Sequence, residues 1–135
     1  MKTGTILKTR KFPVTHYGIY AGNGFVIDNS PADQGVTKRS LSEFAGSAGF
    51  AVHRFPANSA EGQVWISTAE RFLGRPYNAV SFNCEHFVSL ATTNKPSSKQ
   101  VAAASFGALA GGLVSQRPIV GLLVGAFTAL QLARL

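Results

Sequence analysis

Residues 16–27 read HYGIYAGNGFVI, and the predicted architecture is built around this segment. Two short runs rich in aromatic and β-branched residues, at 16–21 and 25–28, flank the glycine-bearing segment 22–24. Runs of this kind joined by such a segment are typical of a β-hairpin. The sequence therefore predicts a hairpin with His16 on its first strand and Asp28 on its second.

The register of the hairpin decides whether His16 and Asp28 share a face. A three-residue loop at 22–24 places His16 opposite Ser30 and makes Asp28 its diagonal neighbour on the same face. A two-residue turn of Asn23 and Gly24 instead puts Asp28 on the other face. A glycine in the left-handed position at the end of the loop favours the first register.

Working outward, residues 5–9 and 50–55 read as further strands, because they are apolar and rich in β-branched or aromatic residues. Residues 29–39 are polar and contain Pro31, so we expect a loop there. Strands interspersed with helices in one chain predict an α+β fold with a small antiparallel sheet.

Three helices follow from capping signals and apolar spacing. Ser40 and Glu43 form a capping box for a short helix, Asn58 and Glu61 open a second one that ends at Gly74 and Pro76, and Asn83 opens a third. We expect their inward residues to be Leu41, Phe44 and Ala45 in the first, Trp65, Ala69, Phe72 and Leu73 in the second, and Phe87, Val88 and Ala91 in the third.

Length and composition suit one globular domain. The 135 residues carry 13 Lys and Arg against 6 Asp and Glu, a formal charge of +7, while 45% are hydrophobic and 14% charged. Such values exclude a disordered chain. The single cysteine excludes a disulfide-stapled mini-protein and a Cys-rich zinc site, and we expect neither a metal nor a cofactor.

The composition changes near residue 95. We expect a catalytic domain at 1–94, a polar hinge at 95–100 and an apolar tail at 101–135, in which residues 101–133 carry one charge, Arg117. A membrane helix needs about 20 apolar residues, but Gln116, Arg117 and Pro118 interrupt the stretch. Three interpretations stay open: one kinked transmembrane anchor, a helical hairpin dipping into one leaflet, or two buried helices.

The tail and the basic charge also bear on partners. Two GxxxG spacings in the tail, starting at Gly107 and Gly121, would let helices approach closely and self-associate. The basic residues are scattered, without the face of interleaved cations and aromatics that a nucleic-acid groove favours, so we expect a membrane surface and no nucleic acid. An unpaired cysteine and no visible signal peptide favour a cytoplasmic setting.

Cys84 is the candidate nucleophile. Asn83 is a good N-cap, which would make Cys84 the first residue of its helix. The unpaired N–H groups and partial positive charge of a helix start favour the reactive thiolate, and the same N–H groups could bind an oxyanion. A buried, inert cysteine is the alternative.

Among the three histidines, His16 is the best candidate for the base. His86 follows Cys84 by two positions on a helix and so points away from it, which suggests a surface or packing role. His53 lies in an apolar strand and reads as a half-buried structural residue. His16 sits on a rigid strand, and in the favoured register Asp28 would orient its ring.

Residues 16–27 together with 83–88, NCEHFV, resemble the lecithin retinol acyltransferase-like family, with an opening strand at 4–7 that is also similar. The resemblance covers about residues 4–92. It implies a permuted papain-like fold in which the histidine strand precedes the cysteine helix, with a membrane-anchoring tail. It also implies Cys84 as nucleophile and His16 as base. In the best-known animal members a second histidine stands where this chain has Asp28.

The resemblance implies that Cys84 takes a fatty acyl group from a glycerophospholipid as a thioester. Transfer to water would make a phospholipase A, and transfer to an amine or lysolipid an acyltransferase. Two other functions stay open. One is a peptidase or amidase of the bacterial cell-wall branch of the same superfamily, and the other is a non-catalytic membrane-bound module.

Overall fold

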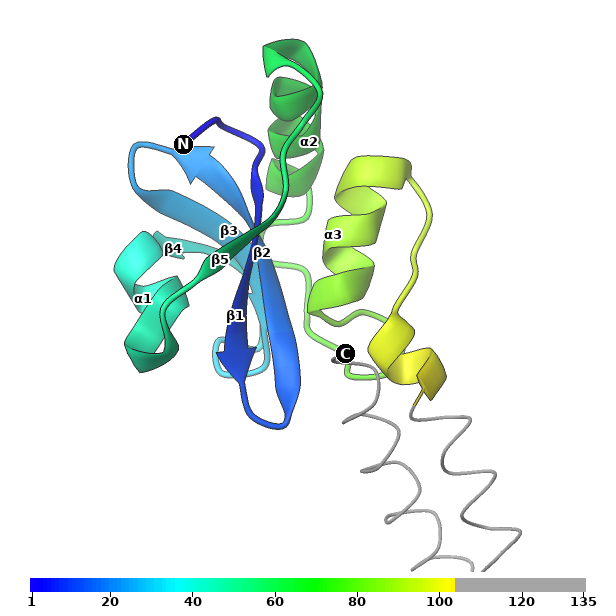
Figure 1. Cartoon of the computed structure of the whole chain (residues 1–135). Helices are drawn as coiled ribbons and strands as arrows, with labels where there is room; N and C mark the ends of the chain where they lie inside the picture. The colour runs from blue at the N-terminus through cyan, green and yellow to red at the C-terminus, as the bar shows by residue number, and fades with distance from the viewer. Residues whose placement is uncertain (104–135) are drawn as a thin grey trace, which may run out of the picture. The chain divides into compact units, whose positions relative to one another are not determined.

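The structure is a computed structural model that describes residues 1–103. Five strands, three α-helices and one 3-10 helix lie within residues 6–93, and a further helical segment begins at residue 99 (Figure 1). Their bounds are β1 (Ile6–Lys11), β2 (Val14–Gly22), β3 (Phe25–Ser30), β4 (Gly35–Ser40), α1 (Leu41–Ala45), η1 (Gly46–Ala48), β5 (Ala51–Arg54), α2 (Ser59–Glu70) and α3 (Cys84–Thr93).

The strands form one antiparallel sheet in the order β4-β3-β2-β1-β5, and the two faces of the sheet are covered differently. The larger apolar cluster joins Ile6, Ile19 and Ile27 to side chains of α2 and α3. The smaller cluster joins Leu7 and Val26 to Phe44 of α1. Figure 1 shows α1 on one side of the sheet and α2 and α3 on the other, so the α+β class is confirmed.

The β2–β3 hairpin combines the two registers that the sequence left open. Its turn is the two-residue Asn23-Gly24, with both residues at positive φ, and Gly22 pairs with Phe25. A bulge between Tyr20 and Gly22 then shifts the pairing, and beyond it Gly18 lies opposite Asp28. This is the register that sets His16 and Asp28 diagonally on one face, so the favoured pairing is confirmed through a different turn.

The loop expected at 29–39 is wrong. β3 runs on to Ser30, and β4 pairs with it continuously from Ser30↔Gly35 to Phe25↔Ser40, so only the turn between them is irregular. Strand β4 has one buried large apolar side chain, Val36, and otherwise carries polar residues. An edge strand is held by backbone hydrogen bonds whatever its side chains are, so a polar sequence did not reveal it.

The helices begin where their caps predict. The Ser40 hydroxyl accepts a hydrogen bond from the backbone N–H of Glu43, whose carboxylate in turn binds the Ser40 backbone N–H, and Asn58 caps α2. However, α2 ends at Glu70 rather than near Gly74, because residues 71–74 form tight turns. Phe72 still packs on the core, but Leu73 is 44% exposed, so its expected inward position is wrong.

The tail prediction falls almost entirely outside the described residues, which reach only residue 103. Within residues 1–103 no helix is long and apolar enough to cross a membrane. The three interpretations of residues 101–135, and the tail-mediated self-association, therefore stay predictions.

Candidate active site

Helix α3 begins at Cys84, as the capping signal predicts. The side-chain oxygen of Asn83 accepts hydrogen bonds from the backbone N–H groups of Glu85, at 2.9 Å, and His86, at 3.1 Å. These two amides are therefore occupied. The expectation that the first-turn N–H groups together would bind an oxyanion needs correction, because only the backbone N–H of Cys84 itself is left as a candidate in that turn.

The Cys84 thiol is a free thiol with 6% of the residue exposed. It donates a weak hydrogen bond to the backbone carbonyl of Thr15, with 3.9 Å between Sγ and the oxygen. Burial raises the pKa of Tyr17 and of Tyr77, and nearby negative charge, which for both includes Cys84, raises it further. Both phenols therefore stay protonated at neutral pH.

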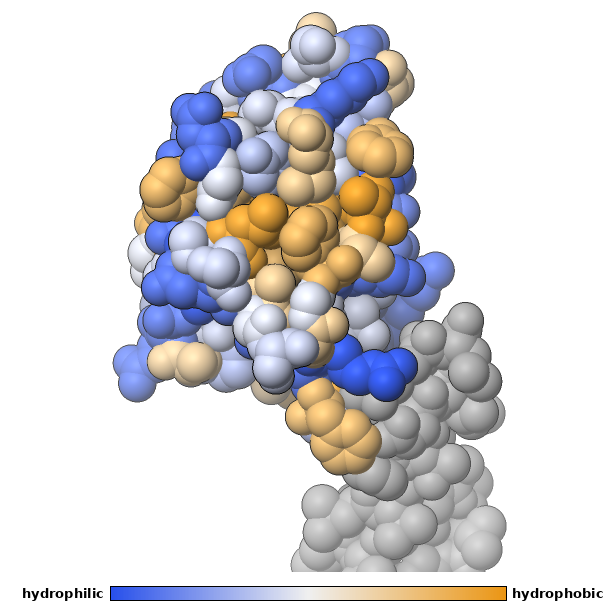
Figure 2. All heavy atoms as spheres, turned by 60° about the vertical axis from the view of Figure 1, so that its left-hand side comes forward, coloured by the Kyte–Doolittle hydropathy of each residue, from blue (hydrophilic) through white to orange (hydrophobic). Residues whose placement is uncertain are grey.

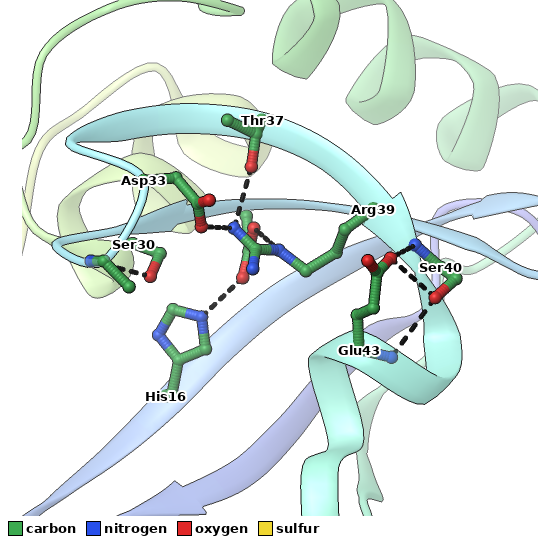
Figure 3. Close-up of polar contacts among 9 residues, drawn as sticks. His16, Ser30, Asp33, Thr37, Arg39, Ser40 and Glu43 are labelled. Atoms are coloured by element: carbon green, nitrogen blue, oxygen red, sulfur yellow. Dashed lines mark hydrogen bonds and ion pairs between the residues drawn. The ribbon is translucent and has the colours of Figure 1, made fainter.

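His16 lies between Asp28 and Cys84. Its Nε2 is 2.7 Å from Oδ2 of Asp28, a contact that Figure 3 draws, and both residues are buried. The Cys84 side chain lies near enough to raise the pKa of His16. Because Nε2 is engaged by the carboxylate, Nδ1 is the nitrogen left to exchange a proton with the thiol. The structure thus brings Cys84, His16 and Asp28 together.

The charge state of His16 follows from these partners. Burial by itself would lower the pKa of His16, but hydrogen bonds to Asp28 and Cys84, helped by the charges of the two side chains, raise it to about 9. Since neutral pH lies well below this value, the ring is protonated there. The site therefore holds an imidazolium between two groups that can carry negative charge.

Close packing against Phe44 fixes the position of the His16 ring. The His16 and Phe44 rings lie with 5.5 Å between their centroids. Gly18 permits this packing, because a Cβ at that position would lie 2.6 Å from Val26 Cγ1 and 2.8 Å from Phe44 Cε2. A glycine two residues after His16 thus lets α1 close over the strand that carries the histidine.

The other two histidines lie elsewhere. His86 Nδ1 accepts a hydrogen bond from the Asn83 backbone N–H at 3.3 Å, which makes His86 part of the α3 cap. Burial lowers its pKa, so the ring is a neutral acceptor. His53 is exposed rather than half-buried, because β5 is an edge strand, and its ring contacts Tyr17 edge-on at 5.1 Å.

Two interactions around the site were missed by sequence reasoning. Arg39 Nε donates to Asp28 Oδ1 at 2.8 Å, from a strand that was expected to be a loop. Asn29, fully buried, donates from Nδ2 to the Phe82 carbonyl at 2.8 Å and so holds the segment leading into α3. Neither residue stands in a recognisable motif, and only the pairing of β3 with β4 brings Arg39 to the carboxylate.

The described residues define an α+β protein in which a cysteine at a helix start, a strand histidine and an aspartate on the neighbouring strand meet in one buried site. The family model described as lecithin retinol acyltransferase matches residues 1–97, so the chain belongs to this family. The human protein phospholipase A and acyltransferase 2 is 27% identical to it, over 91% of this chain and 90% of that protein.

Proposed function

We propose that this protein is a thiol-dependent phospholipid acyl hydrolase or acyltransferase that forms an acyl-thioester on Cys84. Membership of the lecithin retinol acyltransferase family and the similarity to a phospholipase A and acyltransferase support the substrate class. The observation that carries the chemistry is His16, held at 2.7 Å by Asp28 and near enough to Cys84 for that side chain to raise its pKa. The order of histidine strand before cysteine helix supports the permuted papain-like fold, which we propose with this function.

In the first half of the reaction the Cys84 thiolate attacks the ester carbonyl carbon, and a C–S bond forms. The backbone N–H of Cys84, at the start of α3, stabilises the oxyanion. The ester C–O bond then breaks. The lysophospholipid oxygen leaves with the proton of the His16 imidazolium, and the ring becomes neutral.

In the second half the neutral His16 removes a proton from the acceptor as the acceptor attacks the thioester. The C–S bond breaks and the thiolate–imidazolium pair is restored. Water as acceptor releases a fatty acid, and an amine or a lysolipid yields a new acylated product. Asp28 keeps the imidazole in one orientation and stabilises its charged form through both halves.

We also propose that the protein works at a membrane surface, with its free thiol on the cytoplasmic side. Figure 2 shows apolar side chains gathered near the centre of one face, with hydrophilic residues around them. The edge strand β5 and its flanks carry three exposed large apolar side chains, Phe50, Val52 and Phe55. Exposed apolar surface and a net charge of +7 both suit an anionic bilayer.

The decisive experiment measures whether the Cys84 sulfur becomes acylated. Purified full-length protein is incubated with a phospholipid carrying labelled acyl chains, quenched in acid and digested, and the mass of the Cys84 peptide is measured. We expect a peptide heavier by one acyl group. Cys84→Ser should lose this adduct and lower phospholipid hydrolysis by roughly 10³-fold or more, while keeping a wild-type circular dichroism spectrum.

The same experiment separates the alternatives. An unmodified Cys84 peptide together with undiminished hydrolysis by Cys84→Ser would sink the proposal. Acylation of Cys84 by a labelled peptide or amide, but not by the phospholipid, would point to the peptidase or amidase chemistry. No adduct with either substrate, and no alkylation of Cys84 below pH 7, would leave a non-catalytic module.

A further inference from the structure

Asp28 is held from two sides. Its Oδ2 faces His16 Nε2 at 2.7 Å, and its Oδ1 accepts a hydrogen bond from Arg39 Nε at 2.8 Å. The residue is 1% exposed. A buried carboxylate is stable in its charged form only when its oxygens are hydrogen-bonded, and here each oxygen has a charged or chargeable donor.

Arg39 is itself held in place by two further side chains. Its Nη2 donates to Thr37 Oγ1 at 2.8 Å and also contacts the Asp33 carboxylate, as Figure 3 shows. Thr37 lies directly opposite Asp28 in the β3–β4 ladder, and Arg39 is its next neighbour on the same face of β4. The Arg39 side chain is largely buried, so its guanidinium cannot swing freely away from Asp28.

We propose that Arg39 is a positioning residue for the reaction: it fixes the Asp28 carboxylate, which in turn orients the His16 ring. The inference rests on the proposed function, because it assigns Arg39 a role only if His16 transfers protons. Asp33 and Thr37 complete the arrangement by holding the guanidinium. The chain of contacts therefore runs from the turn between β3 and β4 to the thiol of α3.

The geometry suits arginine and no other cation. The planar guanidinium uses Nε for Asp28 while Nη2 reaches Thr37 and Asp33, and the single ammonium of lysine offers no such fork. Burial alone would lower the pKa of Arg39, but the hydrogen bond to Asp33 and the charge of Asp28 outweigh burial and raise it. The group is therefore a permanent cation, and it acts at every pH at which the fold is intact.

Removing Arg39 should disturb the orientation of the Asp28 carboxylate more than it changes the electrostatic field at the His16 ring. The groups that act on His16 are Asp28 from β3 and Cys84 from α3, while α1 offers the Phe44 ring. The 2.7 Å contact between Asp28 and His16 depends on the orientation of the carboxylate, which Arg39 holds through its other oxygen. Loss of orientation should thus outweigh loss of the distant cation, and the pKa of His16 should fall.

The first experiment compares Arg39→Gln with Lys38→Gln in the full chain. Lys38 is the matched control, because it is the adjacent cation on β4, loses the same charge, and lies over the Phe25 ring away from Asp28. We expect Arg39→Gln to lower kcat for phospholipid hydrolysis about 10- to 100-fold with little change in KM. Lys38→Gln should keep the wild-type kcat, and Arg39→Lys should recover only part of the loss.

The second measurement excludes a merely structural role. The His16 ring is followed by NMR titration, assigned with His16→Gln, and its midpoint should move toward 6.5 in Arg39→Gln but not in Lys38→Gln. In addition, Arg39→Gln should lower kcat little further when Asp28 is already Asn, because both substitutions disable the same arrangement.

The results separate this inference from the proposed function. A wild-type protein that forms no thioester, but whose His16 midpoint still falls in Arg39→Gln, would refute the catalytic proposal and keep the positioning of Asp28. A hydrolytically active protein in which Arg39→Gln leaves kcat unchanged, or leaves the His16 midpoint unchanged or higher, overturns the inference. Full additivity of the two substitutions also overturns it.

Discussion

At the scale of the residue, the protonation of His16 is the feature with the widest consequences. The ring is buried, yet its partners raise its pKa to about 9. A protonated histidine in the folded state, next to a carboxylate and a thiol, links the chemistry of the site to the stability of the fold.

The free energy of unfolding should therefore depend on pH, and the sign of this dependence follows from the two pKa values of His16. The unfolded chain loses the His16 proton near pH 6.5 and the folded chain near pH 9, so the folded state binds more protons between these values. Stabilisation by His16 is complete below about pH 6.5 and is lost as the pH rises through 9. We expect the free energy of unfolding to fall by on the order of 2–3 kcal/mol across this range.

Urea unfolding at fixed ionic strength, at pH 6.5 and pH 9, measures the effect as the difference between wild type and His16→Gln. An identical pH slope in wild type and His16→Gln would show that the ring is not held protonated by the fold.

At the scale of the element, the start of α3 does two things at once. Asn83 satisfies the backbone N–H groups of Glu85 and His86, and its own position fixes where the helix begins and hence where the Cys84 sulfur lies. Helix α2 has a similar cap, in which Asn58 accepts from the Glu61 N–H at 2.9 Å, but no site residue lies in its first turn.

The two caps therefore form a matched pair. Asn83→Ala and Asn58→Ala should each cost about 1 kcal/mol of stability, measured by urea unfolding. Only Asn83→Ala should also slow alkylation of Cys84 by iodoacetamide at pH 7, because only that change disturbs the helix start beneath the thiol. Equal alkylation rates in the two variants would show that the α3 cap is purely structural.

The elements also show where sequence reasoning succeeded and where it stopped. Capping residues act on backbone groups three positions away, so Ser40, Asn58 and Asn83 mark their helices from the local sequence alone. The edge strand β4 and the exposure of His53 on β5 depend on which strands lie at the sides of the sheet. That is a property of the assembled sheet, and no local pattern contains it.

At the scale of the whole molecule, the chain joins a sheet-and-helix domain to a strongly apolar segment. The family match ends at residue 97, and residues 101–133 carry one charge, Arg117. We expect deletion of residues 101–135 to abolish most binding to liposomes, because so long an apolar stretch contributes far more to membrane affinity than scattered surface cations do.

Liposome co-sedimentation tests this, with full-length Cys84→Ser as the control that keeps the tail but not the nucleophile. The control should sediment like wild type. Undiminished co-sedimentation of the truncated chain would refute an anchoring role for residues 101–135. Residual binding that disappears at high salt would measure the part due to the basic surface.

The local sequence was enough to predict the α+β class, the β2–β3 hairpin and the starts of α1, α2 and α3, and it proposed Cys84, His16 and Asp28 as site residues. Hydrophobic periodicity, turn residues and helix caps act over a few neighbouring positions, so they can be recognised in the amino-acid sequence. The assembled sheet was needed to show that the bulge near Tyr20 brings Asp28 to the face of His16, and that β4 carries Arg39 to that carboxylate. Such contacts join residues from different strands, and their geometry exists only once backbone pairing has set the register.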